Sequence, residues 1–156
     1  MVSTTQSRII PALRTTQANA VMMYLNNKRY HWFSFGPHFR DIHLFFDEMA
    51  NGALAEVDPF GERARMLGGD PVSTPQEIEA TASIRPADGQ MNPREMLEEA
   101  LSNERRIIQE MREAARRAEE ENDYGTNDLY SQSVQTHEKN AWFIEEFLRR
   151  GDGLGE

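Results

Sequence analysis

Residues 31–47 read HWFSFGPHFRDIHLFFD, and this stretch contains the signals that decide the fold. Gly36 is typical of the end of a helix and Pro37 of the start of the next one, so the stretch predicts a tight turn between two antiparallel helices. His31 and His43 lie at similar distances on either side of this turn. A helical hairpin therefore brings the two imidazoles to the same height.

Three carboxylates continue the pattern along the second of these predicted helices. Asp47 stands four residues after His43, and Glu62 stands four residues after Asp58, so each pair projects from one helix face. The midpoints of the two pairs are fifteen residues apart, which is about 22 Å at roughly 1.5 Å per residue. That separation exceeds any metal–ligand distance. An identical helix packed antiparallel across a two-fold axis would place the first pair of one copy against the second pair of the other, forming two equivalent sites.

The rest of the chain shows four long helical patterns separated by turn signals. They cover about residues 8–33, 37–67, 92–122 and 126–150. A capping-box pattern at residues 74–77 predicts a short extra helix to about Ala82. Pro59 and Gly61 interrupt the second pattern and predict a kink or a break near Val57.

Two helical hairpins joined by a long connection between the second and third helices make an all-α four-helix bundle of crossover topology, for which the ferritin-like arrangement is the natural candidate. A chain of 156 residues with 38% hydrophobic content fits a single domain over residues 1–156. We expect short tails over residues 1–8 and 151–156. Thr126 is the expected N-cap of the fourth long helix.

Composition limits the chemistry. The chain has no cysteine, which excludes disulfides, thiolate ligands and iron–sulfur clusters and leaves nitrogen and oxygen donors suited to iron, manganese or zinc. The formal net charge of -9 repels nucleic acid, and the first twenty residues offer only Arg8 and Arg14 as basic residues. Without a long apolar run or a secretory signal, we expect no membrane span and a cytoplasmic location.

Taken together, these residues closely resemble the Dps family of ferritin-like mini-ferritins over nearly the whole chain. The matching residues are His31, Trp32, Gly36, Phe39, His43, Phe46, Asp47, Glu48, Asp58, Glu62, Arg63, residues 67–69, residues 136–139, Ala141 and Trp142. The resemblance implies a hollow homo-dodecamer that oxidises ferrous iron, preferentially with hydrogen peroxide, and stores the ferric product as a mineral inside the shell. Such a protein protects the cell from oxidative damage.

The resemblance also implies how the ligands are divided. His31, His43 and Asp47 would come from one subunit, and Asp58 and Glu62 from its two-fold mate; zinc is a second candidate occupant. The sequence departs from the family pattern at residues 59–61, which stand between the last two ligands. It also lacks the Lys-rich N-terminal extension with which some members bind DNA, so DNA binding is not carried over.

Further roles each have a plainer alternative. Trp32 is a candidate to intercept stray oxidant, or it packs at an interface. Asp123 and Asp128 are candidates for an acidic entry pore at a three-fold axis, or they serve as turn and cap residues. Glu48 and Glu56 are candidates for mineral nucleation, or they only solvate a helix face.

Two other function classes compete with a ferroxidase. A nucleoid-binding structural protein is disfavoured by the acidic balance, although a salt-sensitive gel shift with duplex DNA would revive it. An intrasubunit di-iron oxidase or larger ferritin would carry Glu-x-x-His motifs on its bundle helices, and the sequence has none. His137 falls on an apolar stripe and is expected to be a buried, hydrogen-bonded histidine.

Overall fold

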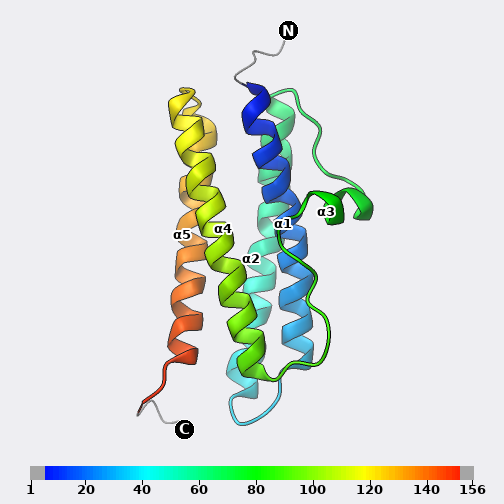
Figure 1. Ribbon diagram of the computed structural model, residues 1–156, viewed down its shortest axis with the longest axis vertical. Coiled ribbons are helices and arrows are strands. Elements are labelled where there is room, and N and C mark those ends of the chain that lie inside the picture. Colours follow the sequence, from blue (N-terminus) through cyan, green and yellow to red (C-terminus); the bar gives the residue numbers. More distant parts are fainter. Residues whose placement is uncertain (1–5, 152–156) are drawn as a thin grey trace.

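The computed structural model describes residues 6–151, and within that range the chain forms five helices and no strand (Figure 1). The helices are α1 (Gln6–Phe33), α2 (Phe39–Met66), α3 (Pro75–Thr81), α4 (Pro93–Glu120) and α5 (Tyr124–Leu148). The four long helices make a bundle in which α1 pairs with α2 and α4 pairs with α5. The predicted all-α bundle with a short extra helix is confirmed. None of the described helices combines the length and apolar character needed to cross a bilayer.

The connection between α2 and α4 sets the topology. It leaves the end of α2 at the top of Figure 1, carries α3 along the outside of α1, and reaches the bottom of the bundle where α4 begins. Consequently α2 and α4 run in the same direction, which is the crossover arrangement expected from the sequence.

Buried amide side chains of α1 hold this connection against the bundle. Gln17 Oε1 accepts a hydrogen bond from the Val72 backbone N–H at 2.8 Å. Asn19 Oδ1 accepts from the backbone N–H groups of residues 83 and 84, at 2.8 and 3.2 Å. Asn26 accepts from the Ala87 N–H at 2.8 Å and donates to the residue 85 carbonyl at 2.9 Å. These bonds satisfy backbone groups of the connection, most of which are partly or fully buried against the bundle.

Helix boundaries follow the predicted caps with two corrections. The capping box of α4 is present, because the Asn92 side chain accepts from the Glu95 N–H and the Glu95 carboxylate accepts from the Asn92 N–H. By contrast, Asp123 and not Thr126 caps α5, since the Asp123 side chain accepts from the Thr126 N–H at 3.0 Å. The expected N-terminal tail is also too long, because α1 already begins at Gln6. The remaining tail predictions, at residues 1–5 and 152–156, lie outside the described residues.

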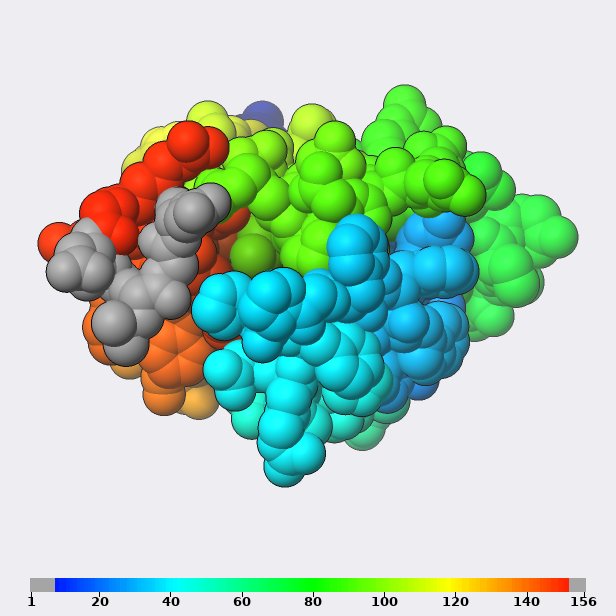
Figure 2. All heavy atoms as spheres, turned by 90° about the horizontal axis from the view of Figure 1, so that it is seen from below, coloured from blue at the N-terminus to red at the C-terminus, as the bar shows by residue number. Residues whose placement is uncertain are grey.

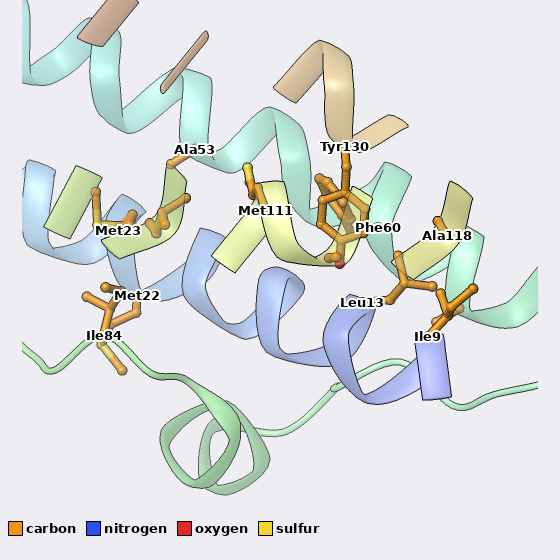
Figure 3. Packing of buried hydrophobic residues seen from close by; sticks show 13 residues of the cluster. Ile9, Leu13, Met22, Met23, Ala53, Phe60, Ile84, Met111, Ala118 and Tyr130 are labelled. Atoms are coloured by element: carbon orange, nitrogen blue, oxygen red, sulfur yellow. The ribbon is translucent and has the colours of Figure 1, made fainter. Parts of the chain in front are cut away.

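Of the predicted kink or break near Val57, the break does not occur, since α2 continues through Pro59 and Gly61. Phe60 is completely buried and packs against Tyr130, with ring centroids 5.1 Å apart (Figure 3). This packing against α5 outweighs the backbone donor that Pro59 lacks. Gly61 has a packing role of its own, since a Cβ atom there would lie 2.5 Å from Gln17 Nε2.

A charged network crosses the bundle interior. His137 is buried as predicted, with Nδ1 2.5 Å from Glu104 Oε2 and Nε2 3.0 Å from Glu56 Oε2. Burial alone would lower the pKa of His137, but the two carboxylates outweigh burial and raise the pKa to about 10. His137 is therefore a protonated donor to carboxylates on two other helices at neutral pH.

The two helical glycines of α2 give opposite predictions for substitution by alanine. We expect Gly52→Ala to stabilise the fold by about 1 kcal/mol, because Gly52 is exposed with open space around it and alanine favours helix. We expect Gly61→Ala to destabilise the fold, because Gln17 is pinned to the Val72 N–H and cannot move aside without breaking that bond. Thermal unfolding of both variants measures the difference, and an increase in melting temperature for Gly61→Ala would contradict the packing role.

The buried histidine makes stability depend on pH. Since the pKa of His137 is higher in the folded chain than its ordinary value of 6.5, protonated His137 contributes its full stabilisation below pH 6.5 and loses it as pH rises through about 10. The largest slope for one proton is about 1.4 kcal/mol per pH unit. We expect the melting temperature to fall more steeply between pH 7 and pH 10 for the unmodified protein than for His137→Gln. His38→Gln, at an exposed histidine, is the control; parallel curves for His137→Gln and the unmodified protein would refute the proton's role.

Candidate metal centre

The hairpin between α1 and α2 brings His31 and His43 into direct contact. Their rings stack with centroids 3.7 Å apart and an interplanar angle of 17°. His31 Nδ1 lies 2.6 Å from the His43 carbonyl oxygen, and His43 Nδ1 lies 2.7 Å from the His31 carbonyl oxygen. A carbonyl oxygen only accepts, so both Nδ1 atoms carry hydrogen and donate. In its neutral form, each imidazole then keeps the lone pair on Nε2, where a metal ion could bind.

Asp47 completes this group but also has a partner within the chain. Its Oδ1 lies 4.0 Å from His31 Nε2 and 2.5 Å from Lys28 Nζ. The hydrogen bond from Lys28 holds the pKa of Asp47 below its usual value, so the carboxylate is ionised at neutral pH. Sequence reasoning missed Lys28, although its position three residues before His31 places both on one side of α1.

The end of the bundle that holds the hairpin turn is seen in Figure 2, where the turn (cyan) lies at the surface beside the start of α4 (green). His31 is largely buried, with 14% of its side chain exposed, whereas Asp47 is 35% exposed. The first group of expected ligands thus lies at the edge of the core, with Asp47 partly open to solvent.

Asp58 and Glu62 form a separate group further along α2. Both are exposed and stand four residues apart on the helix. The unbroken helix keeps this pair about 22 Å from the His43 and Asp47 pair, using roughly 1.5 Å per residue. Among residues 6–151 no group of three or more histidine, aspartate or glutamate residues is arranged to hold a metal ion within one chain. The five-residue ligand set as a whole stays a prediction.

The other candidate residues differ in their exposure to solvent and in the hydrogen bonds that they already make within the chain. Trp32 is 67% exposed. Glu48 is exposed and lines a groove between α2 and α5, whereas Glu56 is only 14% exposed and accepts a hydrogen bond from His137. Asp123 accepts hydrogen bonds on both carboxylate oxygens, whereas Asp128 Oδ2 accepts one from an exposed glutamine amide at 2.7 Å. Glu48 and Asp128 thus remain the more accessible of the predicted nucleation and pore residues.

Comparison with known proteins identifies the family. The ferritin-like domain family matches residues 10–154. The X-ray structure of Dps from Thermosynechococcus elongatus is similar with a TM-score of 0.96 and 45% identity, over 99% of each chain. The chain belongs to the Dps family.

Other relatives agree with this Dps assignment. A DNA protection during starvation protein from Halobacterium salinarum is 32% identical over 89% of this chain and 77% of its own length. General stress protein 20U from Bacillus subtilis is 29% identical over 90% of this chain and 97% of its own length. A Dps protein from Bacillus brevis matches with a TM-score of 0.92 at 29% identity, covering 96% of this chain and 100% of that one. Membership of the Dps family connects the chain with iron storage and protection against oxidative damage.

Proposed function

We propose that this Dps-family protein is a ferroxidase and iron store that oxidises ferrous iron at sites shared by two copies of the chain. The observation that carries the proposal is the pair of hydrogen bonds between His31 and His43. These bonds leave both Nε2 atoms available beside Asp47. The remaining expected ligands, Asp58 and Glu62, are too far along the same rigid helix to join them.

A two-fold axis supplies the missing half. If α2 of one copy packs antiparallel to α2 of its mate, each histidine group faces the carboxylate pair of the other chain. Because such an interface is symmetric, one dimer holds two equivalent sites. We propose a closed homo-dodecamer built on these dimers, with the ferric product held inside as a mineral.

The proposed ligands suit the oxidation of iron. Neutral imidazole and carboxylate bind ferrous iron while leaving positions open for an oxidant, and carboxylates also suit the ferric product. Glu62 is the proposed bridging or strongest carboxylate ligand, and Asp58 is proposed to bind a second iron more weakly, directly or through water. Two ferrous ions reduce one hydrogen peroxide by two electrons; with two protons this yields two waters and releases no hydroxyl radical. Zinc, which also accepts nitrogen and oxygen ligands, is the proposed competing occupant.

In this proposal, further acidic side chains form the iron entry pore and nucleate the mineral. Asp128 and Asp123 are the proposed pore residues, and Asp128 is favoured because both oxygens of Asp123 already accept hydrogen bonds within the chain. Glu48 is favoured over Glu56 as a nucleation residue for the same reason. The proposed location is the cytoplasm. Although several relatives are named for DNA, we do not extend DNA binding to this chain, because its net charge is -9.

Mixed oligomers test whether the sites are shared. We expect His31→Ala/His43→Ala and Asp58→Ala/Glu62→Ala each to abolish fast peroxide-dependent iron oxidation when either assembles alone. Oligomers formed from an equal mixture should recover about a quarter of the wild-type sites, because half of the dimers are mixed and each mixed dimer keeps one intact site. Anaerobic iron titration followed by peroxide addition measures the recovery. No recovery in oligomers shown to be mixed would reject the shared site.

Trp32 gives a separate prediction, because it is exposed and adjoins His31. If its indole intercepts oxidant that escapes the site, Trp32→Phe should increase hydroxyl-radical release during iron oxidation while iron binding stays unchanged. Spin trapping and mass spectrometry of oxidised residues measure this. Trp142→Phe, a second exposed tryptophan far along the chain, is the control. Equal radical yield and protein damage in all three proteins would leave Trp32 as a packing residue.

A further inference from the structure

The C-terminal part of α2 carries the two expected carboxylate ligands on a stretch of helix that has weak backbone support. They hold Asp58 and Glu62 outward, although Pro59 contributes no backbone donor and Gly61 has low helix propensity. In well-formed metal sites the metal–ligand distances lie within about 0.2 Å of their usual values. The direction of these two carboxylates therefore depends on what fixes the inward face of the same turns.

Arg63 fixes that face through two hydrogen bonds to the start of α5. Its Nη2 donates to Asp123 Oδ1 at 2.6 Å, and its Nε donates to Thr126 Oγ1 at 2.9 Å. The ion pair is well shielded, with 23% of the Arg63 side chain and 16% of the Asp123 side chain exposed. Thr126 is completely buried. A partly buried, two-point guanidinium contact of this kind holds orientation as well as distance.

The Asp123 carboxylate and the Thr126 hydroxyl, which accept the hydrogen bonds from Arg63, are also bonded to each other. The Thr126 hydroxyl donates to Asp123 Oδ2 at 2.6 Å, and the Asp123 carboxylate accepts from the Thr126 N–H as the N-cap of α5. Gly125 leaves room for the guanidinium, because a Cβ atom there would lie 2.8 Å from Arg63 Nη2. The first turn of α5 is thus shaped around the arginine, which ties the end of α2 to another helix.

We propose that Arg63 is a positioning residue for the Asp58 and Glu62 half of the metal site, an inference that rests on the proposed function. Glu62 and Arg63 are adjacent on one helix, so a rotation of this turn that redirects Glu62 also pulls Arg63 away from α5. The two hydrogen bonds of Arg63 resist that rotation. The half-site is therefore aimed by the start of α5, 61 residues away in the sequence from Glu62 to Asp123.

Metal binding in the assembled protein tests this role without relying on turnover. Arg63→Met should weaken anaerobic binding of Co(II), measured by calorimetry, by about tenfold and alter the visible absorption of the bound ion, as loss of a supporting contact does in metal sites. Arg65→Met is the matched control, because Arg65 lies on the same helix turn as Arg63. The ion pair of Arg65 with Asp70, at 2.8 Å, is exposed. Arg65→Met should bind Co(II) as the unmodified protein does.

Two conservative variants separate positioning from general stability. Arg63→Lys keeps the charge but loses the two-point contact, so its Co(II) affinity should lie between those of Arg63→Met and the unmodified protein. Asp123→Asn keeps a good N-cap oxygen but removes the ion pair. It should weaken Co(II) binding alone and add little to Arg63→Met, because both changes break one contact. If Arg63→Met does not assemble, Arg63→Lys and Asp123→Asn decide the question in the same assay.

The outcomes distinguish the two proposals. Unaltered Co(II) affinity and spectrum in assembled Arg63→Met, or in both conservative variants, would overturn the positioning role. If His31→Ala/His43→Ala still loses Co(II) in that case, the shared site stands and only the role of Arg63 fails. If His31→Ala/His43→Ala binds Co(II) as the unmodified protein does, the proposed site itself is wrong.

Discussion

Two reciprocal hydrogen bonds between His31 and His43 are the constraint on which the rest of this structure depends. Each imidazole donates from Nδ1 to the backbone carbonyl of the other residue, so the end of α1 and the start of α2 are tied together by the same groups that face the proposed metal. The bonds select the tautomer that leaves Nε2 free. The same hydrogen bonds therefore hold the hairpin together and orient the proposed ligands. Asp47, which accepts a hydrogen bond from Lys28, lies beside them.

The unbroken length of α2 prevents one chain from bringing all five proposed ligands to the same metal ion. Its backbone continues through Pro59 because Phe60 is buried against Tyr130 of α5, and an unbroken helix has a set length per residue. The carboxylates of Asp58 and Glu62 are consequently held away from the histidines, and the proposed site has to be completed by a second copy. Packing inside the monomer thus dictates the form of the assembly in this proposal.

Burying the charge of His137 in the bundle is tolerated because two carboxylates pair with it. His137 lies between carboxylates on α2 and α4, and burial of any one of these groups alone would be strongly unfavourable. The apolar stripe of α5 predicted that His137 is buried, but its partners are 33 and 81 residues away in the sequence. The same holds for the amide groups of α1 that bind the crossover connection. Long-range polar partners have no local sequence pattern, because side chains of many types satisfy a buried donor or acceptor.

The sequence by itself determined the helices, the hairpin turn at Gly36 and Pro37, the crossover topology and the family, because periodic apolar residues and capping residues act over a few neighbouring positions. It also placed His31 beside His43, since helix geometry converts spacing into position. Only the tertiary structure decided that α2 is continuous at Pro59, that Asp123 begins α5 and that Arg63 joins these two helices. Those outcomes depend on contacts between residues distant in the chain, whose free energy exceeds the local preferences that the sequence displays.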